Sequence, residues 1–123
     1  MHNNEISEII PGTFFNMSKL ESLLLAYNKL KHLEIDVFSG LINTGFIFLE
    51  ENKLQYLHPD TILGLPNIVR VNLESNPGLQ VPSDGPFINS KSLSYLELQY
   101  SNINSMSVKT FANVSAMEIL DLT

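Results

Sequence analysis

The stretch "LESLLLAYNKLKHLEIDVFSGL", residues 20–41, decides the fold of this chain. Leucines stand at positions 20, 23, 25, 30, 33 and 41, with Asn28 and Phe38 between them. An amphipathic helix repeats its apolar residues every 3.6 positions and a strand every second position, and the stretch follows neither spacing throughout. Its apolar residues therefore belong to a longer unit, which the search for internal repeats identifies.

The same pattern returns at a nearly constant interval along the whole chain. Its frame reads L-x-x-L-x-L-x-x-N-x-L-x-x-L-x-x-x-x-F-x-x-L and starts again at Thr44, Ile68, Leu93 and Met117. Because the register starts and stops within a repeat, we expect a single array cut out of a longer one. The predicted copies are 20–43, 44–67, 68–92 and 93–116, with partial copies at 1–19 and 117–123.

Each part of the repeat has a predicted structural role. The alternating x-L-x-L-x stretch predicts a short strand with its leucines inward and its other residues outward. The asparagine predicts the end of that strand, because its amide can bond backbone groups of its own turn and of a neighbouring copy. One copy cannot bury its leucines alone, so the copies are expected to stack into a solenoid. The predicted asparagine ladder is Asn4, Asn28, Asn52 and Asn76.

This pattern resembles the leucine-rich repeat over essentially the whole chain. Phenylalanine at the nineteenth repeat position, as at Phe14, Phe38 and Phe111, resembles the 24-residue class of animal extracellular proteins. The chain is similar in this respect to segments of Toll-like receptor ectodomains and to insect leucine-rich immune proteins. The resemblance implies an α/β solenoid: a right-handed superhelix with a parallel β-sheet on its concave face and short helical or irregular return segments on its convex face.

Two copies depart from the pattern. The third is one residue longer than the others and carries "NPGLQVPSDGPF", residues 76–87, in place of a regular return segment. Its Pro-Gly and Asp-Gly pairs predict turns rather than a helix. The segment is either a tolerated insertion or a specific binding loop. The fourth copy has Ser101 where the asparagine belongs, so the ladder should end or shift there.

Composition excludes several classes of function. The 123 residues carry a formal charge of −6, which disfavours binding to a phosphate backbone, so no nucleic-acid partner is expected. The sequence has no cysteine, and no apolar run approaches the roughly 18 residues of a membrane span. The first ten residues lack the basic start and apolar centre of a secretory signal. We expect no direct insertion of this segment into a membrane.

Catalysis has little support in the sequence. Its three histidines have no spacing that suggests zinc, and no H-E-x-x-H, G-x-S-x-G or P-loop motif occurs. The prediction is therefore a protein without catalytic residues, metal or cofactor.

Candidate binding residues are those predicted to point outward from the strands. Leu24, Phe46 and Phe48, with Tyr27 nearby, should form an exposed apolar cluster, the usual material of interface hot spots. Alternatively, these side chains only cover their neighbours, or a flanking copy of the repeat would bury them. Carboxylates beside them, continuing to Asp121, form an acidic strip that either steers a basic partner or is simply solvated. The predicted partner-binding set is Leu24, Tyr27, Phe46, Phe48, Glu50, Glu51, Arg70, Asn72, Glu74, Tyr95, Glu97 and Tyr100.

Two asparagines fit the N-glycosylation acceptor pattern. Asn16 and Asn113 each stand two residues after a repeat phenylalanine, so both should lie at the same phase of the return side. Composition alone would produce about two such matches, but this shared position would let a glycan point outward.

The sequence thus favours a non-enzymatic recognition module that binds a protein or peptide on its concave sheet. The resemblance implies an extracellular or cell-surface location, with a receptor or innate-immune role. A structural or adhesive spacer that associates with itself is the alternative, and a cytosolic scaffold is a third.

Overall fold

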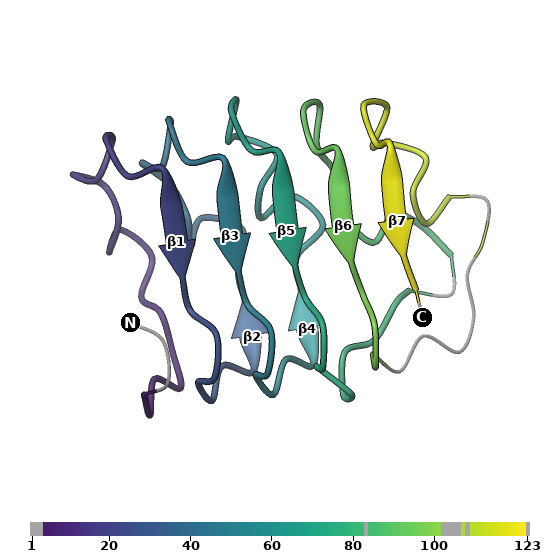
Figure 1. Ribbon diagram of the computed structural model, residues 1–123, viewed down its shortest axis with the longest axis horizontal. Helices are drawn as coiled ribbons and strands as arrows, with labels where there is room; N and C mark the ends of the chain where they lie inside the picture. The colour runs from purple at the N-terminus through teal and green to yellow at the C-terminus, as the bar shows by residue number, and fades with distance from the viewer. Residues whose placement is uncertain (1–3, 83, 102–106, 108, 123) are drawn as a thin grey trace.

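The computed structural model describes residues 4–82, 84–101, 107 and 109–122. Its main feature is a sheet in which every neighbouring pair of strands is parallel. The strands stand side by side in chain order, with β1 and β7 at opposite ends of the row and the return segments behind them (Figure 1). The five strands are β1 (Ser22–Leu24), β3 (Phe46–Phe48), β5 (Arg70–Asn72), β6 (Tyr95–Glu97) and β7 (Ile119–Asp121).

The strand register follows the sequence repeat. Leu23 pairs with Ile47, and Ile47 pairs with Val71, so each partner stands one regular repeat further along the chain. Val71 pairs with Leu96, one residue beyond a regular repeat, and Leu96 pairs with Leu120 after a regular one. The extra residue of the third copy is therefore accommodated outside the sheet. The predicted parallel-strand solenoid is confirmed.

Leucines and phenylalanines of successive repeats fill one continuous core. Phe14 and Phe38 are fully buried, with ring centroids 6.2 Å apart. In the longer third copy Phe87 occupies the twentieth position instead of the nineteenth, yet it too is buried, and its ring meets Phe111 edge-on at 6.2 Å. Phe87 therefore takes the place of the buried repeat phenylalanine in the third copy, although the irregular sequence there does not follow the repeat pattern.

The return segments contain turns and a second, very small sheet. Strands β2 (His32–Leu33) and β4 (Tyr56–Leu57) pair in parallel, and no helix occurs among the described residues. The return segments are thus irregular rather than helical. The second sheet stops after β4 for a simple reason. His58 donates its backbone N–H to Leu33, but Pro82, the equivalent residue one repeat later, has no N–H to donate.

Buried asparagine amides join successive repeats. Asn52 accepts a hydrogen bond from the backbone N–H of Leu30 at 3.0 Å. Its Nδ2 donates to the carbonyls of Leu25 at 2.9 Å and Leu49 at 3.0 Å. Each amide therefore satisfies backbone groups of its own repeat and of the preceding one, which water cannot reach. Asn76 makes the corresponding bonds. Asn28 accepts from the Ile6 N–H and donates to the carbonyls of Leu25 and Ala26 in its own repeat, whereas Asn4 is exposed.

Ser101 keeps part of this ladder in the fourth copy. Its hydroxyl donates to the carbonyl of Leu73 at 3.4 Å, the counterpart of the bond from Asn76 to Leu49. The hydroxyl is too short to replace the other amide bonds. The residues that follow it, 102–106, lie outside the described part of the chain.

The residue before each ladder position has a left-handed backbone. Tyr27, Glu51 and Ser75 have φ of 57° and Tyr100 has φ of 56°, although none is glycine. This conformation costs an L-residue roughly 1–2 kcal/mol. It turns the chain sharply from the strand toward the asparagine, and the bond from the Ser75 N–H to the Gln99 carbonyl, 2.8 Å, helps to hold it there.

We therefore expect Ser75→Gly to stabilise the protein by about 0.5–1 kcal/mol, because the relief of left-handed strain exceeds the extra unfolded-state entropy of glycine. Urea unfolding followed by circular dichroism measures the change. Ser22→Gly is the matched control, because Ser22 lies exposed in β1 with an ordinary φ, where glycine should destabilise. Equal effects of the two substitutions would contradict the prediction.

Candidate protein-binding face

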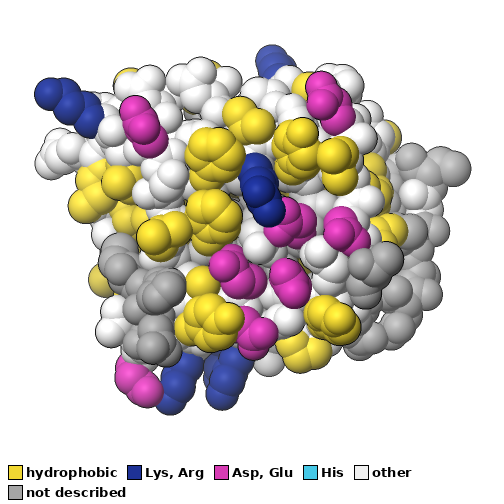
Figure 2. Space-filling model, viewed as in Figure 1, with side chains coloured by type: hydrophobic (Ala, Val, Ile, Leu, Met, Phe, Trp, Pro, Cys, Tyr) yellow, Lys and Arg dark blue, Asp and Glu magenta, His cyan; other side chains and the backbone are white. Residues whose placement is uncertain are grey.

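The outward face of the five-stranded sheet holds most of the predicted binding residues. Figure 2 shows hydrophobic side chains on both sides of a central basic side chain, a group of acidic side chains just below it, and further hydrophobic side chains beside the lower edge of that group. The strand register decides which of these side chains are neighbours. Leu24 lies opposite Phe48, and Phe46 lies opposite Arg70.

Leu24, Phe46 and Phe48 form the apolar cluster of this face. Leu24 is 48% exposed and Phe46 is 41% exposed. The rings of Phe46 and Phe48 stack, with centroids 6.5 Å apart and planes 7° from parallel. Their inward neighbours Leu23 and Ile47 are already buried in the core, so the outward cluster is surplus to the packing of the repeat. Large apolar side chains in such positions are typical of interfaces.

A second apolar pair, Tyr95 and Ile119, lies on the other side of Arg70. The two residues are directly opposite one another on β6 and β7, and both are exposed. The predicted set included Tyr95 but not Ile119. The position of Ile119 in the repeat would have placed it beside Tyr95, because the two stand one regular repeat apart.

Arg70 forms an ion pair with another residue of this face. Its guanidinium forms an ion pair with the carboxylate of Glu97 on the adjacent strand β6. Glu97 is mostly covered, while the arginine side chain is 41% exposed. Arg70 is thus held between the apolar cluster and the second apolar pair, and it offsets one charge of the acidic strip.

The acidic strip consists of Glu50, Glu51, Glu74, Glu97 and Asp121. Four of these side chains are half-buried and Glu51 is exposed. The register places Glu97 directly opposite Asp121, and the amide of Gln99 donates to Asp121 Oδ2 at 2.7 Å. The strip therefore runs across β3, β5, β6 and β7 at the downstream ends of the strands.

Asn72 differs from its predicted role as an exposed contact residue. Its side chain is 8% exposed, and its Oδ1 accepts a hydrogen bond from the backbone N–H of Glu74 at 2.9 Å. The short amide folds down onto its own strand and cannot reach far beyond the sheet. Asn72 is thus buried rather than exposed, and its role as a partner contact stays a prediction.

The remaining predicted contacts lie just past the strand ends. Tyr27 and Tyr100 are exposed, Tyr100 by 72%. Near Tyr27 and Glu51, Lys29 pairs with Glu5, with 2.6 Å between Nζ and Oε2. The hydrogen bond and the charge of Lys29 lower the pKa of Glu5. Lys53 borders the same corner, so Glu51 faces a partly basic environment.

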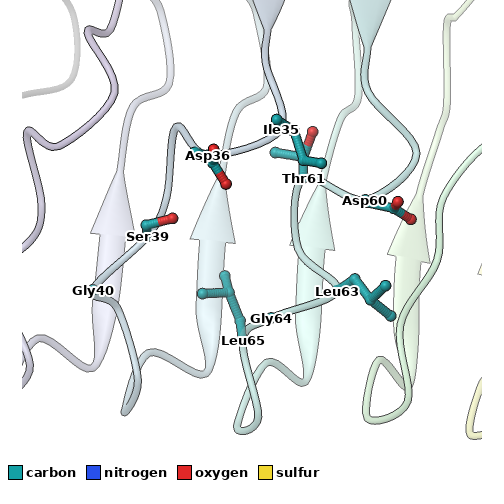
Figure 3. Close-up of a pocket in the computed structure, with 9 residues that line it drawn as sticks. All are labelled: Ile35, Asp36, Ser39, Gly40, Asp60, Thr61, Leu63, Gly64 and Leu65. Carbon is teal, nitrogen blue, oxygen red and sulfur yellow. The ribbon is translucent and has the colours of Figure 1, made fainter.

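The opposite side of the molecule has a shallow depression between the return segments of two neighbouring repeats (Figure 3). Two of its polar groups already have partners. The Thr61 hydroxyl donates to the carbonyl of His58 at 2.7 Å, and Asp60 Oδ1 accepts from Asn89 at 2.7 Å. The depression is lined by Ile35, Asp36, Ser39, Gly40, Asp60, Thr61, Leu63, Gly64 and Leu65. It brings together no nucleophile, base and acid that suggest catalysis.

The two predicted glycosylation positions, Asn16 and Asn113, lie on return segments and are exposed. Asn113 donates its amide to Asn89 Oδ1 at 3.0 Å, at the surface. In the described part of the chain, no three His, Cys, Asp or Glu side chains gather as metal ligands do. Among the same residues, no helix has the length and apolar character needed to cross a bilayer.

Parallel strands that recur once in every repeat, a leucine core and an asparagine ladder define a repeat solenoid with an open sheet face. A family model described as "Leucine rich repeat" matches residues 1–44 and 25–77. The chain belongs to the leucine-rich repeat family. Searches of curated proteins and of solved structures found no match.

Proposed function

We propose that this chain is a non-enzymatic recognition module whose five-stranded sheet binds a protein or peptide partner. The observation that carries the proposal is the apolar cluster formed by the exposed Leu24 and Phe46 with the half-buried Phe48, which lies on the outward side of the sheet, outside the core. Leucine-rich repeats commonly mediate recognition between proteins, and the face spans four strand spacings, about 20 Å. That width suits a short segment of a partner.

We expect Phe46→Ser combined with Phe48→Ser to weaken binding by about tenfold or more, because buried aromatic anchors supply much of the affinity of an interface. Peptides selected from a random phage-displayed library on the unmodified chain provide the ligands, and fluorescence anisotropy gives their affinities. Hydrogen exchange identifies which of the selected peptides protect β3.

The control removes the same kind of side chain from the opposite side. Ile35 and Leu63 are exposed by 45% and 42% and line the depression between the return segments. Ile35→Ser with Leu63→Ser should leave the affinity unchanged. Unchanged binding by the Phe46/Phe48 variant, with an unchanged circular dichroism spectrum, would refute the proposal.

The proposed setting is extracellular or at the cell surface, in a receptor ectodomain or innate-immune protein. Its support is the resemblance of the repeat to animal extracellular arrays, together with the exposure of Asn16 and Asn113. Expression in a secretory cell tests this: glycan mass at either asparagine would support it. If the secreted protein carries no glycan at either asparagine, the result would favour the cytosolic scaffold instead.

Self-association of an adhesive or structural spacer is the second candidate. Ile119 is exposed on the outward side of β7, and a second copy that covers it is the contact that this alternative requires. Light scattering behind a sizing column, over a wide dilution range, distinguishes the two functions. Concentration-dependent assembly that persists in the Phe46/Phe48 variant would favour the spacer.

A further inference from the structure

We propose that the partner of the sheet face is a cationic amphipathic helix lying across the strands. Its apolar side would contact the apolar cluster and the second apolar pair, and its lysines or arginines would lie over the acidic strip. This inference rests on the proposed function and specifies the chemistry of the ligand.

The charge of the face selects a basic partner. The described outward positions in line with the five strands hold four carboxylates of the acidic strip, those of Glu50, Glu74, Glu97 and Asp121, and one basic residue, Arg70, a net of three negative charges. Arg70 already pairs with Glu97. No hydrogen bond or ion pair joins the Glu74 carboxylate to another described residue. A cation placed over this carboxylate would therefore gain attraction without displacing an existing partner.

The position of the lysines shows which part of the strip has no lysine beside it. Lys29 and Lys53 border the strip only near Glu51, at its end beside Tyr27. On the described strands that carry Glu97 and Asp121, and on β5 beside them, the only basic group is Arg70. The partner's cations should therefore lie over β5, β6 and β7, while its largest apolar side chain meets the apolar cluster on β3.

The dimensions of the face favour a helix over an extended peptide. Phe46, Tyr95 and Ile119 occupy the first outward position of their strands and form a row across the sheet. Neighbouring strands are about 4.8 Å apart, close to the roughly 5.4 Å that separates successive turns of a helix. Same-side residues of an extended peptide are about 6.8 Å apart and lose register after two strands. A helix that covers the roughly 20 Å face has about thirteen residues.

The apolar residues occupy the first and second outward positions of the strands and the carboxylates the second and third, so a helix needs both kinds of side chain on adjoining faces. The first outward position is mostly apolar, whereas Glu50 and Glu74 occupy the third. In Figure 2 the central acidic group directly adjoins the hydrophobic side chains of the sheet face. A purely cationic segment would leave the apolar cluster uncovered, and a purely apolar helix would bury the carboxylates without compensation.

The probe is a synthetic leucine–lysine peptide of about fourteen residues, with its leucines at helical spacing. Its counterpart carries glutamate in place of every lysine. We expect the lysine peptide to bind at least tenfold more tightly than the glutamate peptide in titration calorimetry. Glu74→Gln with Asp121→Asn should weaken the lysine peptide about five- to tenfold at low salt and reduce the salt dependence of its affinity.

The control variant removes two negative charges from the opposite side. Glu34→Gln with Asp36→Asn gives the same net charge, but both residues lie outside the five-stranded sheet, on a return segment. It should change the affinity less than twofold. Equal weakening by both variants would mean that overall charge attracts the peptide, and would overturn the inference. Absence of binding by the lysine peptide at millimolar concentration would do the same.

The Phe46/Phe48 variant separates this inference from the proposed function. If the two peptides bind equally and both lose affinity in that variant, the face is a binding site without charge selection. The proposed function would then stand and the cationic partner would be wrong. If the Phe46/Phe48 variant binds library-selected peptides normally, the proposed function itself fails.

Discussion

Replacing Gly40 by alanine is expected to destabilise the protein by about 3–5 kcal/mol. A Cβ on Gly40 would stand 2.4 Å from the Phe14 carbonyl oxygen and 2.6 Å from the Phe15 Cα, both backbone atoms of the preceding repeat. Overpacking of this kind costs about 1–3 kcal/mol. The φ of +105° lies beyond the left-handed region that L-residues can enter, which adds about 1–3 kcal/mol. Thermal unfolding should show a fall in Tm of more than about 10 °C.

The matched control for this substitution is one repeat further along the chain. Gly64 occupies the same repeat phase, but no atom beyond its chain neighbours lies within 4 Å of the place that a Cβ would occupy, and its φ is not positive. Both glycines line the depression in Figure 3. Gly64→Ala should therefore be neutral or stabilise slightly. A similar loss of stability for both alanines would show that the close approach at Gly40 does not restrict the repeat.

The two glycines show which features of the return side can be predicted from the sequence and which cannot. Their phase in the repeat follows from Phe38 and Ile62, two residues earlier. The distance between one return segment and the next, however, depends on how neighbouring turns pack. That distance is short beside Phe14 and long beside Gly64, although the sequence offers glycine at both sites.

The strands were predictable because the inward leucines have a strict register. That register also identified Leu24, Phe46 and Phe48 as outward neighbours. It could not predict the burial of Asn72, which depends on a local hydrogen bond from the Glu74 N–H to its side chain. Short amide side chains can form such bonds with nearby backbone groups, and the repeat pattern does not show where they do.

The return side was less predictable for similar reasons. The role of Phe87 as the buried phenylalanine of the third copy was not recognised, because the one-residue insertion moves it from the nineteenth to the twentieth position of the repeat. The left-handed backbone at Tyr27 and Tyr100 was not predictable, because neither residue is a glycine, the usual sequence signal for this conformation. The small β2–β4 sheet involves only two residues per strand, too few for an alternating pattern to be recognised.

Replacing Asn52 by alanine is expected to cost about 3 kcal/mol. The substitution leaves the Leu30 N–H without its acceptor, in a region that is almost fully buried. It also removes one of the two amide donors from each of the carbonyls of Leu25 and Leu49, which keep their bonds from Asn28 and Asn76. A buried N–H left unpaired costs about 1–3 kcal/mol, and the weaker bonding of the two carbonyls places the loss toward the upper end of that range. Asn28→Ala should cost about 1–3 kcal/mol, because the Ile6 N–H that it serves is only partly buried.

An exposed asparagine provides the comparison for this prediction. Asn67 also bonds the preceding repeat, through its Nδ2 and the Ile42 carbonyl at 2.7 Å, but at the surface. Water can replace that bond, so Asn67→Ala should cost less than about 1 kcal/mol. Urea unfolding of the three variants separates the cases. Equal, small losses at Asn52 and Asn67 would mean that the repeats are joined by leucine packing and strand pairing alone. A large loss only at Asn52 would assign the cohesion between neighbouring repeats in part to the buried amides, whose spacing in the sequence first indicated the fold.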